Sequence, residues 1–438
     1  MRVVLVSPQS EKPFTISYKV RKSKLSPPTG ILYLASAIQD NFETAVIDSQ
    51  FYDVSSEKIA ERILSLYPDV VGLSVNYHFF LRNAKKIAQN VKKIEPNITI
   101  VFGGSFATFL ADELIKETFI DIVVLKEGEV SFGLCLKRLE RKTSLRDIPG
   151  IVFKENSRTH RNEFSSYINN LDSVSFPDYS FLENPEQYLA KIVSSRGCNF
   201  NCIYCTTPTM WKKWRARTPS NIIEEIKDKV RRFNIDSFHF ADDNFCVDKK
   251  RMYEIMHRIE KENLGIRLGF SSRIELVDDD MLEQCAKANF KTIFFGVESG
   301  SERILNHLRR RYSVSDIEKT IDKAIECGIL PFVSFMIGMP WETADDIEQT
   351  FRLMQRINTP AIGLHVFTPY PGTEVYNHPE KYGITVEVHH PEDTIGETVL
   401  HRTRHLRSED LRKMWIEGLG IAAKREREAK AYLGRLAF

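Results

Sequence analysis

The stretch 196–205 reads RGCNFNCIYC and places three cysteines, Cys198, Cys202 and Cys205, at the spacing C-x3-C-x2-C. With 7 cysteines in 438 residues, this spacing is expected by chance roughly 0.002 times. Three thiolates this close together favour a soft metal, because sulfur ligands select zinc, Cu(I) or iron–sulfur clusters. The stretch therefore predicts a metal centre held by these three cysteines.

The alternatives for such a centre differ in how many protein ligands they need. A structural zinc site and an electron-carrying [4Fe–4S] cluster each take four, and no fourth Cys or His stands near the triplet. Three cysteines would leave one iron open to bind and reduce a substrate. The remaining alternative is that the three cysteines bind no metal and are buried near one another by chance, because free buried cysteines act as small hydrophobic residues. That description fits the other four: Cys135, Cys246, Cys285 and Cys327.

Six β-prone runs alternate with helical stretches between residues 186 and 378, and the triplet follows the first run. Strands that alternate with helices in this way predict parallel pairing, here as a partial (β/α)6 barrel. Chemistry in such barrels gathers at the carboxyl ends of the strands. The runs are 190–194, 237–241, 267–271, 292–297, 331–337 and 363–367, with helices expected between them, for example at 221–232 and 314–327.

The triplet, with the aromatic Tyr204 before its last cysteine, resembles the signature of the radical S-adenosylmethionine (SAM) superfamily. The resemblance implies a [4Fe–4S] cluster whose open iron chelates the amino and carboxylate groups of SAM, with Tyr204 among the SAM-binding residues. An electron from the cluster then cleaves SAM to methionine and a 5′-deoxyadenosyl radical. The family places the triplet after the first barrel strand, as this sequence does.

Further motifs that match the family follow the second and third runs, and each has a structural alternative. Asp242 and Asp243 are expected to hold the SAM ammonium, unless they form an Asp-rich turn before the next helix. Arg273 is expected to bind the SAM carboxylate through its guanidinium fork, unless it makes a surface salt bridge.

The fourth and fifth runs end in two more motifs of the family. Glu298 and Ser299, in the stretch GVESGS, are expected to bind the ribose hydroxyls of SAM. Gly338, in the stretch MIGMPWET, is expected on the adenine side of SAM. Many relatives have glycine where Trp341 stands, so this loop departs from the family pattern.

Residues 1–150 alternate between short runs rich in Val and Ile and amphipathic helical stretches. Nearly continuous apolar runs are typical of parallel strands that are buried on both faces. The alternation predicts a doubly wound, Rossmann-like parallel sheet that binds ligands outside the carboxyl ends of its strands. Strands are expected at 3–7, 44–48, 70–75, 99–102 and 120–125, and helices at 30–40, 56–66, 80–95, 107–117 and 129–141.

Motifs of this first domain extend the resemblance to the cobalamin-binding-domain radical SAM family, over roughly residues 1–378. They are PPTGILYLA at 27–35, VGLSV at 71–75, GGS at 103–105 and KEGE at 126–129. The resemblance implies cobalamin at the strand ends, although the glycines also suit a tight turn. The D-x-H-x-x-G loop of many cobalamin modules is absent from the sequence, and His78 does not match it. The residues expected at cobalamin are Pro8, Ser74, Asn76, Tyr77, Gly103, Gly104, Glu127 and Gly128.

Two further segments complete the domain organisation. Residues 151–185 are rich in turn residues and are expected to form a linker between the domains. Residues 379–438 are expected to form a mostly helical region that covers the barrel mouth, with a helix that starts near Ser408. The basic stretch 401–407 before that helix suits a solvated lead-in better than an anion site.

The composition of the chain bears on its cellular location and on its binding partners. The 61 basic and 59 acidic residues leave a net charge of +2, which does not favour nucleic acid or anionic lipid as a partner. No apolar run reaches about 18 residues, so no membrane span is expected. The odd number of cysteines without a disulfide spacing, and the lack of a targeting segment, favour the cytoplasm.

The leading functional hypothesis is a cobalamin-dependent radical SAM methyltransferase that acts on an unactivated carbon of a small-molecule or natural-product substrate. Its electron would come from an external donor of the flavodoxin or ferredoxin type. A radical SAM enzyme of the same architecture that dehydrates, epimerises, rearranges or cyclises, with or without cobalamin, is the alternative. A tRNA methylthiotransferase would need three more cysteines in the first domain, where only Cys135 stands. An electron carrier would not need the SAM motifs.

Overall fold

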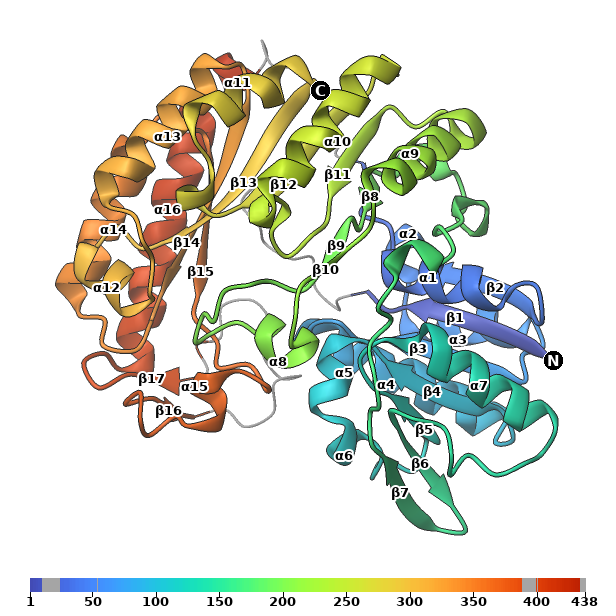
Figure 1. The fold of residues 1–438 in the computed structure, drawn as a ribbon. Helices are drawn as coiled ribbons and strands as arrows, with labels where there is room; N and C mark the ends of the chain where they lie inside the picture. The colour runs from blue at the N-terminus through green and yellow to red at the C-terminus, as the bar shows by residue number, and fades with distance from the viewer. Residues whose placement is uncertain (10–23, 53, 388–398, 400, 434–438) are drawn as a thin grey trace. The chain divides into compact units, whose positions relative to one another are not determined.

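The computed structural model describes residues 1–9, 24–52, 54–387, 399 and 401–433, with side chains described as far as residue 427. The chain divides into two compact units, one built mainly from residues 25–188 and the other mainly from residues 189–387. Figure 1 shows each unit as a sheet flanked by helices. None of the helices in the described ranges is both long and apolar enough to cross a bilayer.

The first unit is built on a seven-stranded sheet in the order β2-β1-β3-β4-β5-β6-β7, whose first five strands are parallel. Its strands are rich in Val and Ile because helices cover both faces, and α3 and α4 pack together, as do α1 and α7. The expected doubly wound sheet is confirmed. The parallel strands are β1 (Arg2–Ser7), β2 (Glu43–Asp48), β3 (Val70–Ser74), β4 (Thr99–Gly103) and β5 (Ile122–Val124), and the helices are α1 (Thr29–Ile38), α3 (Ser56–Leu64), α4 (His78–Ile94) and α7 (Gly128–Glu140).

Two stretches of this unit differ from the sequence prediction. The helix expected at 107–117 is two short helices, α5 (Ser105–Phe109) and α6 (Ala111–Leu114). The expected linker begins instead with a hairpin, β6 (Ile151–Glu155) and β7 (Arg158–Asn162), which pairs antiparallel with β5. Asn156 and Ser157 both have positive φ, 50° and 61°, which suits a two-residue hairpin turn. The hairpin adds two strands to the sheet.

The second unit is built on six parallel strands in the order β15-β14-β13-β12-β11-β8. No pairing between β8 and β15 closes the sheet within the described residues, so it is an open, partial barrel as expected. The strands are β8 (Ala190–Ile192), β11 (Ser237–Phe240), β12 (Arg267–Ser272), β13 (Phe290–Glu298), β14 (Leu330–Ile337) and β15 (Ala361–Val366). The helices of the outer layer are α9 (Pro219–Phe233), α10 (Lys249–Glu262), α11 (Asp279–Lys287), α13 (Val314–Glu326) and α14 (Ala344–Arg356).

The C-terminal helix α16 (Ser408–Leu433) is the largest element after this barrel, and it starts where the sequence predicts. It lies along β15 and α14, as Figure 1 shows, and Trp415 donates an indole N–H to the Leu364 carbonyl at 3.3 Å. Leu411 and Ala422 are buried on its apolar face. The helix therefore extends the outer layer at the edge of the sheet, and Leu411 near its start lies beside Gly338 in the loop after β14. That the region 379–438 covers the barrel mouth stays a prediction.

Candidate active site

The three cysteines lie on a loop whose base is tied by a short ribbon. β9 (Ser195–Arg196) follows β8 and pairs antiparallel with β10 (Arg215–Ala216), so residues 197–214 form one closed loop, here called the cysteine loop. Gly197 opens it with φ +93°, and a Cβ there would lie 2.6 Å from the Lys213 carbonyl oxygen. Only glycine fits this close approach.

All three thiols are free and partly buried, and N–H donors approach each of them. The Arg273 Nη1 lies 3.2 Å from the Cys202 Sγ, and the Thr207 N–H donates to the Cys205 Sγ at 3.5 Å. The Cys198 sulfur accepts from the Phe200 N–H, although burial raises the pKa of this thiol to about 11. N–H groups aimed at sulfur stabilise the thiolate form that metals require, and they tune iron–sulfur clusters.

This donor set fits an iron–sulfur cluster. It offers three soft ligands on one loop, and the other four cysteines of the sequence lie outside that loop. In the described part of the chain, no three side chains of His, Cys, Asp or Glu form a site for a single metal ion. Cys198, Cys202 and Cys205 are therefore the residues that would hold the cluster.

Asp242 and Asp243, which follow β11, both hold the base of the cysteine loop. The Asp242 Oδ1 accepts from the backbone N–H groups of Ser194 and Ser195 at 2.7 and 2.8 Å. The Asp243 carboxylate accepts from the Gly197 N–H at 3.1 Å and from the Thr207 hydroxyl at 3.0 Å. Asp243 thus joins the residue before the first cysteine to a residue after the last one. Binding of the SAM ammonium by these carboxylates stays a prediction.

We expect Asp243→Asn to raise the reduction potential of the cluster by tens of millivolts, because it removes a negative charge beside the cysteines. Burial, and to a smaller extent the charge of Asp243, raises the pKa of Cys198 and Cys205, so this charge acts on both sulfurs. A redox titration followed by electron paramagnetic resonance (EPR) measures the potential. An unchanged potential with full cluster occupancy would show that Asp243 acts only through its hydrogen bonds.

Arg273 is buried at the cysteine loop, and the salt bridge expected as its structural alternative is present as a buried pair with Glu275. Its guanidinium bonds the Glu275 Oε1 through Nε at 2.8 Å and Nη2 at 2.5 Å, and it lies 3.9 Å from the centre of the Phe200 ring. Its Nη1 is directed at Cys202. The guanidinium is therefore fixed beside Cys202, and its binding of the SAM carboxylate stays a prediction.

Glu298 and Tyr204 meet in a buried network that the sequence did not reveal. The Glu298 Oε1 accepts from the Arg310 Nη2 at 2.7 Å and from the Tyr204 hydroxyl at 3.1 Å, and Arg310 also contacts the Tyr204 oxygen. Sequence reasoning missed Arg310 because it stands in the run Arg309-Arg310-Arg311, which resembles a solvated basic patch. Only Arg310 of the three is buried. The network ties the cysteine loop to the end of β13.

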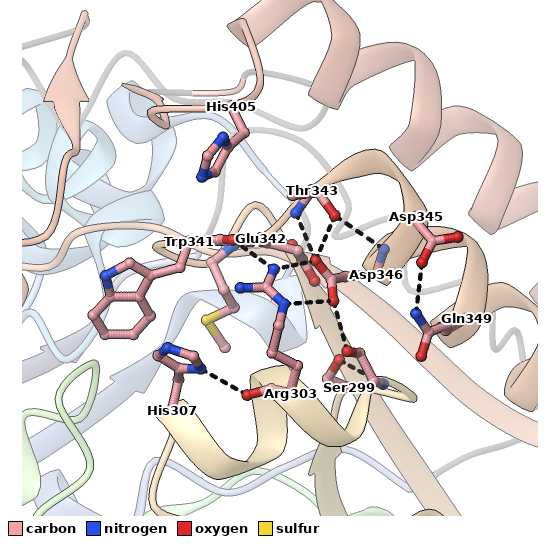
Figure 2. Close-up of polar contacts among 12 residues, drawn as sticks. Ser299, Arg303, His307, Trp341, Glu342, Thr343, Asp345, Asp346, Gln349 and His405 are labelled. Atoms are coloured by element: carbon pink, nitrogen blue, oxygen red, sulfur yellow. Dashed lines mark hydrogen bonds and ion pairs between the residues drawn. The ribbon is translucent and has the colours of Figure 1, made fainter.

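Ser299 is fully buried at the end of β13, and its expected role at the SAM ribose stays a prediction. Its hydroxyl lies 3.2 Å from the Thr350 hydroxyl and accepts from the Ser301 N–H at 3.1 Å. Figure 2 shows Ser299 beside Asp346, below the loop that carries Trp341. Ser299 therefore shapes the turn after β13, while Glu298 lies closer to the cysteine loop.

The loop after β14 turns around Gly338 and a fully buried carboxyl group. The Glu342 Oε2 accepts from the N–H groups of Gly338 and Met339 at 2.5 and 3.1 Å, while no hydrogen-bond partner reaches its Oε1 among the described residues. Trp341 has φ +68°, uncommon for a bulky residue. Figure 2 shows its indole beside the His307 ring, with 4.9 Å between ring centres. The two ring planes are tilted by 35°, so the Trp341 indole packs against His307 without stacking face to face.

The buried Glu342 predicts a pH dependence of stability. Burial raises its pKa to about 8, so the folded chain binds a proton that the unfolded chain releases near pH 4.5. The free energy of unfolding should therefore fall as pH rises from about 4.5 to 8, by at most about 1.4 kcal/mol per pH unit from this group. Urea unfolding at several pH values measures this slope. The isosteric Glu342→Gln should remove it, and an equal slope in that variant would contradict the prediction.

The residues expected at cobalamin lie at the carboxyl ends of the parallel strands of the first sheet. Tyr77 is 55% exposed and stacks on Phe79, with 5.2 Å between ring centres. Gly104 has φ +99°, and a Cβ there would lie 2.8 Å from the Val75 carbonyl oxygen, so the turn itself requires glycine. The remaining expected residues follow the same strands: Pro8 after β1, Ser74 and Asn76 at the end of β3, Gly103 at the end of β4, and Glu127 and Gly128 after β5.

Two of these side chains are already engaged within the protein. The Asn76 Oδ1 accepts from the Ser105 N–H at 3.1 Å, and the Glu127 Oε2 accepts from the Ile168 N–H at 2.8 Å. These hydrogen bonds order the strand-end loops, in which Asn76 and Tyr77 are exposed and Glu127 is buried. Burial lowers the pKa of the neighbouring His78 to about 4, so its imidazole is neutral at physiological pH.

Each of the two units matches the model of a known protein family. The family model of the radical SAM superfamily matches residues 192–354, and that of the B12 binding domain matches residues 23–136. An uncharacterized methyltransferase of Pyrococcus horikoshii is 28% identical over 422 residues, which cover 94% of this chain and 90% of that protein. An anaerobic magnesium-protoporphyrin IX monomethyl ester cyclase of Rubrivivax gelatinosus is 26% identical over 379 residues, which cover 83% of this chain and 67% of that protein.

A solved structure shares the fold. The radical SAM methyltransferase TsrM of Kitasatospora setae, with cobalamin and a [4Fe–4S] cluster bound, aligns with a TM-score of 0.75 and 15% identity. The alignment covers 97% of this chain and 88% of that chain. With the cysteine loop on a partial barrel and a matching B12 binding domain ahead of it, the chain belongs to the radical SAM superfamily, in the group whose members carry an N-terminal B12-binding domain.

Proposed function

We propose that the protein is a cobalamin-dependent radical SAM methyltransferase that methylates an unactivated carbon of a small-molecule substrate. The observation that carries the proposal is the cysteine loop with three ligands and N–H donors directed at its sulfurs, in a chain that also has a B12-binding domain. The methyltransferase relative from Pyrococcus horikoshii, aligned over nearly the whole of both chains, favours methyl transfer.

The surface at the ends of the first sheet fits a flat macrocycle. The exposed ring of Tyr77 and the backbone at Gly103 and Gly104 offer an aromatic and main-chain surface there. When bound, the cluster and SAM supply a carbon-centred radical, and cobalamin supplies a methyl group.

The chain's own residues prepare the site for this chemistry. Asp242 and Asp243 hold the base of the cysteine loop through the backbone N–H groups of Ser194 and Gly197. Arg273 offers a fixed guanidinium beside Cys202 for the carboxylate of SAM. Glu298 and Arg310 both contact the Tyr204 hydroxyl, so they hold the part of the cysteine loop that precedes Cys205. The electron itself comes from an external donor, for which we propose a flavodoxin or ferredoxin.

A radical reaction without methyl transfer is the second candidate. The observation that favours it is the similarity to a cyclase over 83% of this chain, at nearly the same identity as the methyltransferase. Both reactions need the same cluster and SAM contacts, so the two candidates differ in whether a methyl group reaches the product.

The experiment that separates them measures cofactors and methyl transfer together. Protein purified anaerobically from cells supplied with cobalamin is analysed for iron and cobalt, and then incubated with SAM labelled in its methyl group. About four irons and one cobalamin per chain, with label transferred to the cobalamin, would support the methyltransferase. Four irons without cobalamin after reconstitution would favour the second candidate. Loss of cluster binding altogether would contradict both.

A further inference from the structure

The backbone at Gly338, in the loop after β14, is held by side chains on both of its polar groups. The Glu342 carboxylate accepts from its N–H, and the His401 Nε2 lies 2.8 Å from its carbonyl oxygen. A carbonyl oxygen only accepts, so this Nε2 carries the proton and donates. Gly338 has φ +83°, a conformation that other residues rarely adopt. The two hydrogen bonds therefore fix a backbone shape that requires glycine.

His401 reaches this loop from a part of the chain outside the six-stranded sheet. It begins β17 (His401–Arg402), which pairs antiparallel with β16 (Thr385–Val386) as a short ribbon after the last barrel strand (Figure 1). The family model of the radical SAM superfamily ends at residue 354, well before this ribbon. The family match therefore does not account for the histidine.

The imidazole of His401 is fully buried in apolar surroundings. Its ring lies nearly perpendicular to the Phe367 ring, with 5.3 Å between ring centres. Among the described residues, no hydrogen-bond partner reaches its Nδ1. A buried nitrogen without a partner costs free energy that an apolar side chain would avoid. In that part of the chain, the bond to Gly338 is the side-chain contact that accounts for a histidine here.

The loop after β14 also packs with the cysteine loop. Met339 is fully buried in one apolar cluster with Ile203 of the cysteine loop and with Phe367. The Ile203 carbonyl accepts from the Val375 N–H at 3.3 Å, which ties the same region to the segment after β15. Protein interiors are closely packed, so a shift of the loop at Gly338 would disturb the packing beside the cluster ligands.

We infer that His401 is a positioning residue for SAM: it holds the Gly338 carbonyl, and with it the loop on which the adenine side of SAM is expected. The inference rests on the proposed function and on the expected place of Gly338 at SAM. It makes the ribbon of β16 and β17 part of the SAM site. It also implies linkage, because a ribbon that favours SAM binding must be stabilised by SAM to the same extent.

Two substitutions separate the hydrogen bond of His401 from the bulk of its side chain. His401→Leu fills the space without a donor, whereas His401→Gln offers an amide N–H in place of Nε2. Equilibrium dialysis of cluster-loaded protein without reductant should show SAM binding about tenfold weaker in the leucine variant, because the Gly338 carbonyl loses its donor. The glutamine variant should stay within about threefold of the unaltered protein. His257→Leu removes an exposed histidine on α10 and should change no affinity.

A rate measurement distinguishes positioning from general damage to the fold. With SAM at saturation, formation of 5′-deoxyadenosine in His401→Leu should stay within about twofold of the unaltered protein, while the KM for SAM rises. Damage to the fold would lower the saturated rate together with the affinity.

Hydrogen–deuterium exchange of the unaltered protein tests the linkage without any substitution. SAM should slow amide exchange in residues 338–342 and in residues 401–406 together. This measurement decides the question even if His401→Leu does not load its cluster.

Three results would overturn the inference. They are unchanged SAM affinity in His401→Leu, a glutamine variant as weak as the leucine variant, and slower exchange confined to residues 338–342. Failure of the unaltered, cluster-loaded protein to bind SAM would instead overturn the proposed function. None of these results depends on whether a methyl group is transferred.

Discussion

Replacement of Cys202 by alanine is expected to abolish formation of 5′-deoxyadenosine from SAM, by a factor of at least about 10³. The cysteine loop offers three thiols, and a cluster that must leave one iron open for SAM has no ligand to spare. Alanine at Cys198 or Cys205 should have the same effect, because each of the three thiols is expected to bind a different iron of the cluster. The measurement is 5′-deoxyadenosine by chromatography after incubation with SAM and dithionite, with iron content determined on the same samples.

Cys327→Ala provides the matched control for this experiment. Cys327 is also a free and partly buried cysteine, but it ends α13 on the outer layer of the barrel. This variant should retain its iron and its activity. Retained cleavage of SAM in any of the three loop variants would contradict the assignment of the cluster ligands, whatever the iron content.

Arg310→Met is expected to lower the free energy of unfolding by about 3–5 kcal/mol. Its guanidinium lies 2.7 Å from the Glu298 carboxylate, and both side chains are buried. Methionine has a similar length and no charge, so the variant leaves a buried carboxylate without its partner. The same change frees Tyr204 from its contact with Arg310, and SAM affinity should fall with it. Urea unfolding of the cluster-free protein and SAM titration of the loaded protein measure the two effects.

A second substitution tests the electrostatic cause. The double variant Arg310→Met, Glu298→Gln removes the buried charge together with its partner, and it should recover most of the lost stability. Arg309→Met removes the exposed neighbour and should change stability by less than about 0.5 kcal/mol. If the double variant is no more stable than Arg310→Met, the arginine contributes through packing alone.

The fold was predictable from sequence because its strands are apolar over nearly their whole length. Runs such as 70–75 and 331–337 differ from the observed strands by one residue at an end. Regions that depend on edge pairing were less predictable. In the hairpin at 151–162 the second strand is mostly exposed, and the turn residues resemble those of a linker.

The site was predictable where its residues lie close together in the chain. The three cysteines can be recognised by their spacing in the sequence. Arg310, in contrast, contacts Glu298 and Tyr204, which lie 12 and 106 residues away in the chain. Asp242 and Asp243 were identified, yet their hydrogen bonds run to the loop base, which no local pattern could reveal.

The ribbon of β9 and β10, together with Asp242 and Asp243, has a consequence for the lifetime of the enzyme in air. These contacts hold the cysteine loop through backbone groups and carboxylates, none of which belongs to the metal centre. Loss of the inorganic cluster to oxygen would therefore leave these contacts in place, so the base of the loop would not have to refold before a new cluster is built from iron and sulfide.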